Sequence, residues 1–321
     1  MNAIQSLPGA HEPRMHPVNS QTNPIQGRVV WSPIKSLWFT AHAFLALIGG
    51  WFTFSLDAVL VSFVFTLLTL CLGHTVGLHR LLVHRSFRCP LWLEYALVHL
   101  GTLVGMGGPH RILHMHDIRD WAQRQPKCHP FYTDQGPVWR DWFWQTHAEL
   151  KLEHPPAFTI EPQVAHDPVY RWMQRTWMLQ QLPWALLLYA FGSWAWVVWG
   201  ISVRIVVSLT GHWFIGYLAH NGSRRDWHLQ GHAVQGYNLP HLGLITMGEG
   251  WHNNHHAYPE SAKLGLKRHH HDPGWWFICL LKGLGLAWDI QTPETLPPRI
   301  ERQAIPEKRS VRPRAATFFT L

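Results

Sequence analysis

The chain has 321 residues, of which 47% are hydrophobic and 14% are charged, and its 27 Lys and Arg exceed its 19 Asp and Glu to give a formal net charge of +8. This aromatic and aliphatic content excludes intrinsic disorder for most of the chain. Four scattered cysteines without a C-x-x-C pair exclude a disulfide scaffold and a cysteine zinc site.

Mean hydropathy is close to neutral at −0.09, so the apolar residues must be clustered in particular segments. The counts of 25 His and 20 Trp are unusual for a chain of this length. Histidine is the commonest metal ligand, and tryptophan concentrates where an apolar region meets water. Both features point to a protein with apolar segments and a histidine-rich polar part.

The first 35 residues are polar, contain several prolines and lack the apolar core of a signal peptide. We expect residues 1–35 to form a flexible tail.

Two uncharged runs follow, Ser36–Leu56 and Ala58–Leu78, and only Asp57 separates them. Because a bilayer crossing needs about 20 apolar residues, the runs predict two transmembrane helices over about 37–56 and 58–78. They would form a hairpin.

A weaker apolar run from Leu91 to Pro109 carries Glu94 and several glycines, and is interpreted as a re-entrant or interfacial segment. A second long apolar block, Met178–Ser223, contains Arg204 and a Gly192-Ser193 turn signal. It predicts two further transmembrane helices over about 178–192 and 195–219.

Apart from Arg204, every Lys and Arg falls in residues 1–35, 79–177 or 224–321. By the positive-inside rule, these segments and both termini are expected in the cytoplasm. The rule explains the basic flanks of the spans, so we expect no nucleic-acid binding.

Histidines gather beside the predicted spans. Positions i, i+3 and i+4 of a helix share one face, so the H-x-x-H-H spacing from His252 predicts a metal site. Imidazole suits iron, copper, zinc or nickel. In the His116 segment Asp120 can ligate, whereas Arg119 has no acceptor atom. Eight candidate ligands are too many for one ion, so they predict two metals at the cytoplasmic membrane face. These candidates are His79, His84, His116, Asp120, His220, His252, His255 and His256.

Other histidines have ordinary explanations. The run His269–His271 is interpreted as a solvated segment beside the membrane. Single histidines near the membrane interface are expected to be structural hydrogen-bonding residues: His42, His74, His99, His147, His154, His166 and His241.

The segments Gly77–Phe87 and Gly248–His256 resemble the membrane fatty-acyl desaturases of the stearoyl-CoA delta-9 type, and the similarity extends from about Ser36 to about Gln291. The resemblance implies an all-α integral membrane fold in which four transmembrane helices form two hairpins under a cytoplasmic helical cap. It places cytoplasmic segments at 79–177 and 220–291 and leaves residues 292–321 as a basic tail. The cap would hold a histidine-bound diiron centre, with two Fe ions that use O2 and two delivered electrons.

The same resemblance implies residue roles. His79, His84, His252, His255 and His256 would be ligands, His220 would match an extra family histidine, and Trp213 would lie near the substrate thioester. The resemblance assigns no catalytic residue beyond the metal centre.

The middle box departs from the family pattern H-x-x-H-H, because Arg119 and Asp120 follow His116. If Asp120 ligates, one iron exchanges an imidazole for an anionic oxygen. His212, roughly on the helical face of His220, is a further candidate ligand, and Gly216 replaces an asparagine common in the family.

The expected function is therefore an O2-dependent fatty-acyl desaturase that introduces a cis double bond, with acyl-CoA as the favoured substrate. It would lie in a bacterial inner membrane or the endoplasmic reticulum. Electrons are expected from a separate ferredoxin, rubredoxin or cytochrome b5 type of protein, since residues 292–321 contain no cytochrome domain.

Several alternatives stay open. A histidine-box hydroxylase would use the same metals and return oxygen to carbon, and an inactive relative would fit the altered middle box. A His-rich metal-binding or transport protein would place its ligands along the spans rather than at one face. A soluble carboxylate diiron bundle is rejected, because it requires two E-x-x-H motifs and two further glutamates, and only Glu249 and His252 fit that pattern.

Overall fold

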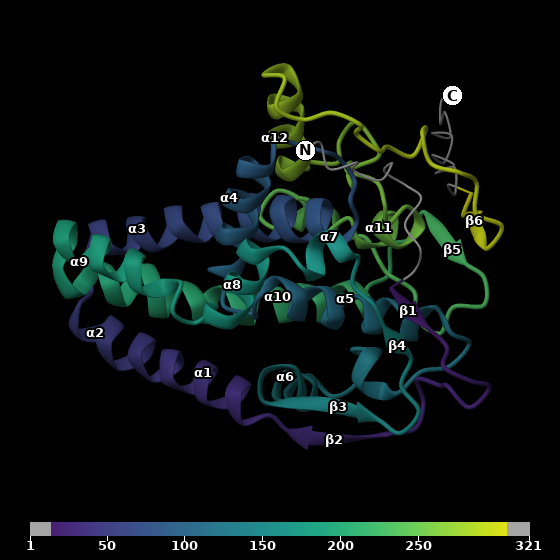
Figure 1. Cartoon of the computed structure of the whole chain (residues 1–321), viewed down its shortest axis with the longest axis horizontal. Coiled ribbons are helices and arrows are strands. Elements are labelled where there is room, and N and C mark those ends of the chain that lie inside the picture. Colours follow the sequence, from purple (N-terminus) through teal and green to yellow (C-terminus); the bar gives the residue numbers. More distant parts are fainter. Residues whose placement is uncertain (1–13, 307–321) are drawn as a thin grey trace, which may run out of the picture.

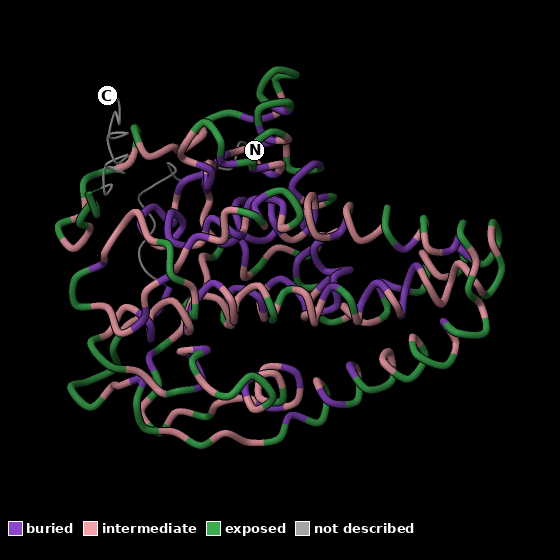
Figure 2. Tube along the Cα trace, turned by 180° about the vertical axis from the view of Figure 1, so that it is seen from behind, coloured by how far each residue is buried: buried purple, intermediate pink, exposed green. Residues whose placement is uncertain are grey.

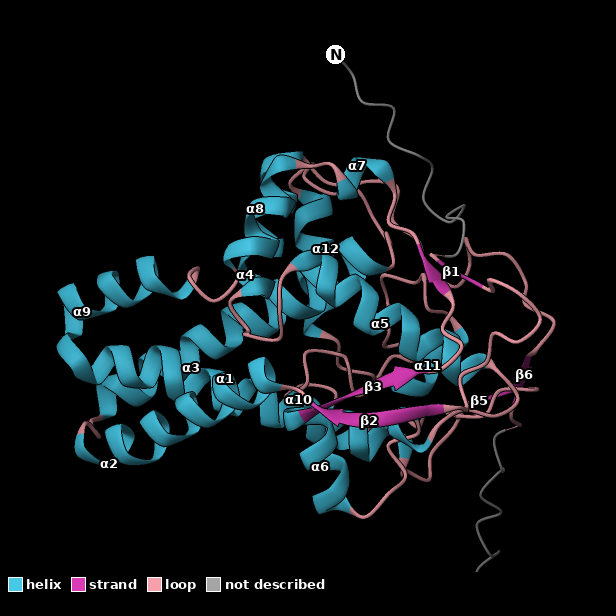
Figure 3. Cartoon of the chain, turned by 60° about the horizontal axis from the view of Figure 1, so that its bottom comes forward, coloured by secondary structure: helices cyan, strands magenta, loops and turns pink. Residues whose placement is uncertain are grey.

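The structure is a computed structural model that describes residues 14–306. Its described part is mostly helical, with long helices extending from a more compact part that holds the short strands (Figure 1, Figure 3).

The first helical hairpin begins at Pro33, where proline occupies the first turn and needs no amide partner. Its first helix comprises α1 (Pro33–Phe44), η1 (Leu45–Gly49) and α2 (Gly50–Phe52), and its second comprises α3 (Leu56–Leu67) and η2 (Leu68–Val83). The turn therefore precedes Asp57, which lies in the first turn of α3, where a negative charge is favourable. The second helix also runs past the expected end at Leu78 and includes His79.

The second hairpin is formed by α9 (Gln181–Val197), η4 (Val198–Val203) and α10 (Arg204–His220). The helix breaks at Gly192 and Ser193, where Ser193 has φ 59°, so the predicted turn lies where the sequence signal placed it. The indole Nε1 of Trp196 donates to Asp57 Oδ2 at 2.6 Å and joins the turn ends of both hairpins.

The free ends of the hairpins carry large apolar side chains with little protein around them. Trp51, Phe52 and Leu56 are each more than 80% exposed. Buried residues instead gather in the opposite part of the molecule (Figure 2). By length and apolar composition, Leu56–Val83 and Gln181–His220 qualify as membrane-spanning segments, and exposed apolar side chains of this size are expected to meet lipid.

The run that starts at Leu91 forms α4 (Leu91–Thr102), which packs closely against η2. A Cβ atom at Gly77 would lie 2.4 Å from the carbonyl oxygen of Leu97, so only glycine allows this approach. The chain then turns at Gly105 and Gly107, both with positive φ, and enters α5 (Pro109–Arg124). This packing places α5, which carries His116, next to the end of η2.

The remaining helices are short and belong to the compact part. They are η3 (Pro130–Tyr132), α6 (Val138–His147), α7 (Pro162–Ala165), α8 (Pro168–Thr176), η5 (Pro240–Leu242), α11 (His252–Ala257) and α12 (Pro273–Gly283).

Three two-stranded antiparallel sheets occur within residues 14–306, which an all-α prediction does not include. Strands β1 (Met15–His16) and β2 (Gly27–Trp31) lie in the segment expected to be a flexible tail, and β6 (Arg302–Ala304) lies in the expected C-terminal tail. Each pairs with a strand far away in sequence, which a local pattern does not reveal. Residues 1–13 and 307–321 of those tails lie outside the described residues. The pairs are β1 (Met15–His16) with β4 (Ala157–Phe158), β2 (Gly27–Trp31) with β3 (Ala148–Leu152), and β5 (Trp227–Leu229) with β6 (Arg302–Ala304).

Candidate metal centre

Four histidines from three segments form one compact group, here called the four-histidine group. His79 lies near the end of η2 and His84 directly follows that helix, whereas His116 comes from α5 and His255 from α11. One nitrogen from each ring lies within 4.8 Å of those of the others. Because α5 packs against η2 and the ring of His255 from α11 contacts that of His79, imidazoles up to 176 positions apart in the sequence come together (255 − 79 = 176).

A second group, the three-histidine group, consists of His220, His252 and His256. His220 is the last residue of α10, and the other two lie one turn apart on α11. The Nε2 atom of His252 is 3.2 Å from Nε2 of His220 and 3.0 Å from Nε2 of His256. His255, on the same short helix, belongs to the other group, so α11 supplies both.

Three carboxylates hold the outer nitrogens of these rings. Glu249 Oε2 lies 2.8 Å from His79 Nδ1, Asp117 Oδ1 lies 3.2 Å from His116 Nδ1, and Asp134 Oδ2 lies 2.9 Å from His220 Nδ1. His116 Nδ1 is hydrogen-bonded to Asp117, and His220 Nδ1 also lies 2.9 Å from the carbonyl oxygen of Gly216, whereas His79 Nδ1 meets Glu249 as an ion-pair contact only. Acceptors on this side of a ring favour a proton on Nδ1 and leave the Nε2 lone pair free for a cation. The sequence analysis missed all three in this role. Glu249 and Asp117 adjoin histidine motifs, which is a usable signal, whereas Asp134 carries none.

The electrostatics of α11 favour metal ligation. Burial lowers the pKa of His252, His255 and His256 well below the ordinary value, and neighbouring imidazoles lower each pKa further. These rings are therefore neutral at pH 7, which is the form that binds a metal.

Two of the supporting carboxylates, Glu249 and Asp134, are charged. Burial disfavours ionisation of Glu249, but the neighbouring His79 and Arg80 outweigh it and lower the pKa of Glu249 to about 2. Burial of Asp134 is outweighed in the same way by Arg119 and His220, and its pKa also falls to about 2.

The nitrogen atoms themselves fit a metal ion. Within residues 14–306, the buried atoms His84 Nε2, His255 Nδ1 and His79 Nδ1 have no hydrogen-bond partner, although His79 Nδ1 lies 2.8 Å from Glu249 Oε2. In the three-histidine group, Nε2 of His252 lies at hydrogen-bond distance from the Nε2 atoms of both His220 and His256. Neutral rings protonated on Nδ1 would direct lone pairs at one another there, and a bound cation removes that repulsion.

The structure does not bring two further candidate ligands into either group. The carboxylate of Asp120 pairs with Arg124, with Oδ2 at 2.9 Å from Nη2. The ring of His212 instead contacts His74, with centroids 4.7 Å apart. Arg119 donates to both carboxylate oxygens of Asp134, at 2.7 and 2.6 Å.

Trp213, the predicted substrate-binding residue, lies on α10, and its indole donates to Asp141 Oδ2 at 2.7 Å. The structure shows how this indole is held but contains no substrate.

Three of the seven histidines expected to be structural make side-chain hydrogen bonds. The rings of His42, His99 and His147 contact Ser202 Oγ, Trp184 Nε1 and Ser36 Oγ at 3.1, 3.1 and 2.7 Å. The run His269–His271 needs a correction, because His270 is buried and stacks on Trp251 with ring centroids 3.6 Å apart. That stacking lies next to His252 and supports α11.

Comparisons with known proteins agree with the geometry. The family model described as fatty acid desaturase matches residues 57–276. An sn-2 palmitoyl-lipid 9-desaturase of Nostoc sp. (strain 36) is 36% identical over 267 residues, covering 79% of this chain and 88% of the relative. An sn-1 stearoyl-lipid 9-desaturase of Anabaena variabilis is 36% identical over 270 residues, covering 79% and 93%. An acyl-CoA C20 Delta5-desaturase of Anemone leveillei is 30% identical over 253 residues, covering 76% and 77%.

Proposed function

Because the chain belongs to the fatty acid desaturase family, and is thus a membrane-bound fatty-acyl desaturase that acts on paired donors with O2, we propose that its two histidine groups hold two Fe ions. In this proposal the enzyme introduces a cis double bond into a saturated acyl chain. The observation that carries it is the pair of imidazole groups, each backed by at least one carboxylate, that share α11.

The chemistry explains why iron is needed. An unactivated methylene has no acidic proton and no leaving group, so bound iron would supply the O2 chemistry that amino-acid side chains lack. The chain's own residues do the rest. Glu249, Asp117 and Asp134 fix the ring orientations, and neutral imidazoles present their lone pairs.

The three-histidine group has one imidazole fewer than its neighbour, and we propose that Asp120 completes it. Asp120 lies on α5, one turn after His116, and would have to leave Arg124 to ligate. His212 is the second candidate, and it would have to leave its contact with His74.

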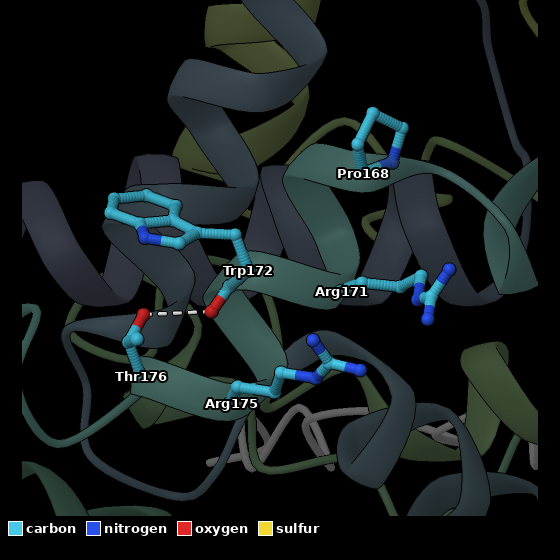
Figure 4. A pocket seen from close by; sticks show the side chains of 5 residues that line it. All are labelled: Pro168, Arg171, Trp172, Arg175 and Thr176. Atoms are coloured by element: carbon cyan, nitrogen blue, oxygen red, sulfur yellow. Dashed lines mark hydrogen bonds between the residues drawn. The ribbon is translucent and has the colours of Figure 1, made fainter.

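We also propose that the two hairpins cross the membrane as four helices and that both termini and the histidine groups lie on the cytoplasmic side. Helix α8, just before the second hairpin, supports this orientation. Arg171 and Arg175 extend to the same side of α8 in Figure 4, and Trp172, with 55% of its surface exposed, extends to the other side of this helix. Arginines flank spans on the cytoplasmic side, and tryptophan anchors helices at the interface.

The substrate carrier is proposed from the relatives. The two relatives at 36% identity are named as 9-desaturases of palmitoyl or stearoyl lipids, whereas the Anemone relative at 30% is named for acyl-CoA. We therefore propose a lipid-linked acyl chain as the first candidate, desaturated at carbon 9, and acyl-CoA, which the sequence alone favours, as the second. Trp213, fixed by Asp141, would lie near the linkage between acyl chain and carrier. A separate redox protein would deliver electrons.

The decisive test is lipid analysis of a host that expresses the chain beside the variants His255→Ala and His256→Ala. A new cis alkene in the wild type and in neither variant is expected. An alcohol in place of the alkene would identify a hydroxylase. Pulse labelling, with separation of acyl-CoA from glycerolipid before analysis, shows which pool acquires the double bond first.

A further inference from the structure

Arg14 stands just before β1, far outside residues 57–276 that match the family model. We propose that Arg14 is a positioning residue of the four-histidine group, through which the N-terminal segment helps to shape the metal site. The inference rests on the proposed function, because it takes that group to be a metal site.

The guanidinium of Arg14 is buried, with 8% of the side chain exposed. Its Nε donates to Glu161 Oε2 at 2.8 Å, and its Nη2 lies 2.7 Å from Glu161 Oε1. Nη1 donates to Asp117 Oδ2 at 3.0 Å and to the carbonyl oxygen of Val83 at 3.1 Å, and Nη2 donates to that of Leu82 at 3.4 Å. A guanidinium has five N–H donors, and Arg14 uses them in four hydrogen bonds and one further ion-pair contact.

The bond to Asp117 leads directly to the four-histidine group. One oxygen of Asp117 accepts from Arg14, and the other accepts from His116 Nδ1 at 3.2 Å. Arg14 therefore fixes the rotamer of the carboxylate that selects the tautomer of His116. Residues behind metal ligands commonly change metal affinity about 10–100-fold when they are replaced.

The bonds to Leu82 and Val83 lead to a second histidine of the group. These carbonyls belong to the last turn of η2, where no helical amide is left to satisfy them. His84 follows at once, and its buried Nε2 has no partner within residues 14–306. By binding the carbonyls before His84, Arg14 holds the backbone from which that ring projects.

The N-terminal strand holds Arg14 in place. The carbonyl oxygen of Arg14 accepts from the amide of Thr159 at 2.9 Å, and the adjoining β1 pairs Met15 with Phe158. Met15 itself packs in a buried cluster with Ile118 of α5. The backbone of Arg14 and the side chain of Met15 are thus fixed to the parts of the chain that carry Glu161 and His116.

Charge and shape both require arginine. Burial opposes a cation, but the bonds and charges of Glu161 and Asp117 outweigh it and raise the pKa of Arg14, so it stays charged. Lysine has three donors on one atom and cannot satisfy two carboxylates and two carbonyls in this fork. If Arg14 lost its charge, the negative charges of Asp117 and Glu161 would no longer be compensated by this cation.

The test uses the purified full chain with Co2+ or Fe2+ added, and it measures metal per chain, affinity and the Co2+ absorption spectrum. His255→Ala and His256→Ala give reference spectra for loss of the four-histidine and three-histidine sites. Arg14→Gln is expected to weaken one site about 10–100-fold and to reproduce the spectral change of His255→Ala. Arg14→Lys should lie between Arg14→Gln and wild type. Arg28→Gln, on the exposed side of β2 in the same N-terminal segment, should match wild type.

Wild-type affinity at both sites in folded Arg14→Gln overturns the inference. If that chain does not fold, folded Arg14→Lys decides by the same criterion. A spectral change that matches His256→Ala also overturns it, because Arg14 would then act on the wrong group. Failure of the proposed function is distinct, since the wild type itself would bind no metal or His255→Ala would bind as much as wild type.

Discussion

The two histidine groups share helix α11 but are built differently around it. The four-histidine group takes rings from η2, α5, α11 and the residue after η2, and Glu249 and Asp117 stand behind it. The three-histidine group has one ring fewer and a single backing carboxylate, Asp134. The first is therefore closer to a complete imidazole site, and the second depends more heavily on each of its parts.

The altered middle box explains part of this asymmetry. The family resemblance places two histidines where this chain has Arg119 and Asp120. Arg119 does not approach a metal position but binds both oxygens of Asp134, which in turn holds His220. The position of Arg119, which the resemblance assigns to a ligand, thus carries a cation here that holds Asp134 behind His220.

The largest effects are expected from His255→Ala and His256→Ala, which remove adjacent residues of one helix but act on different groups. Each should abolish desaturation, a loss beyond the about 100-fold typical of residues behind the ligands. Each should also remove metal from its own group first, as shown by elemental analysis and Co2+ spectra. Retained double-bond formation in either variant would contradict the assignment of two cooperating sites.

Asp134→Asn should weaken the three-histidine site about 10–100-fold and leave the four-histidine site unchanged. The asparagine amide lacks the negative charge by which the Asp134 carboxylate pairs with Arg119 and His220. Glu249→Gln is the matched change on the other side and should weaken the four-histidine site through His79. Titration with Co2+ at each site checks both. Equal weakening of both sites by either variant would show that the groups are not separable.

Asp120→Ala tests whether the three-histidine group uses a fourth ligand. If Asp120 ligates, the variant should lose about tenfold or more in affinity at that site alone. Arg124→Gln is the control, because it breaks the ion pair of Asp120 while leaving the carboxylate free. It should bind metal as well as wild type or better. Wild-type iron content in Asp120→Ala would remove Asp120 from the ligand set, since a partly exposed ion pair contributes only about 0–1 kcal/mol.

Local spacing predicts much of this centre, but it does not predict what stands behind it. His252, His255 and His256 follow helical spacing, and Gly192-Ser193 marks the second hairpin, so each can be found from a short stretch of sequence. Asp134 reaches His220 from 86 positions away (220 − 134 = 86), and β2 pairs with β3 across a longer separation. Such contacts depend on tertiary packing, which the pattern of one segment does not encode. Arg14 illustrates this most clearly, because its polar surroundings in sequence indicate only a flexible tail.

The smallest effect is expected from acidification, which should loosen both groups together through His270. Burial, aided by the neighbouring His269, lowers the pKa of His270 from 6.5 to about 4. The folded chain therefore binds this proton less readily than the unfolded chain. The stability contributed by neutral His270 is complete above about pH 6.5 and is lost as the pH falls towards 4, on the order of 1–2 kcal/mol. Since His270 stacks on Trp251 beside α11, the loss should affect both groups alike.

His270→Phe keeps an aromatic ring against Trp251 and removes the titration. Its thermal unfolding midpoint in detergent should fall less between pH 7 and pH 5 than that of wild type. An identical fall in both chains would assign the acid sensitivity to other groups, with the seven histidines of the centre as the first to examine.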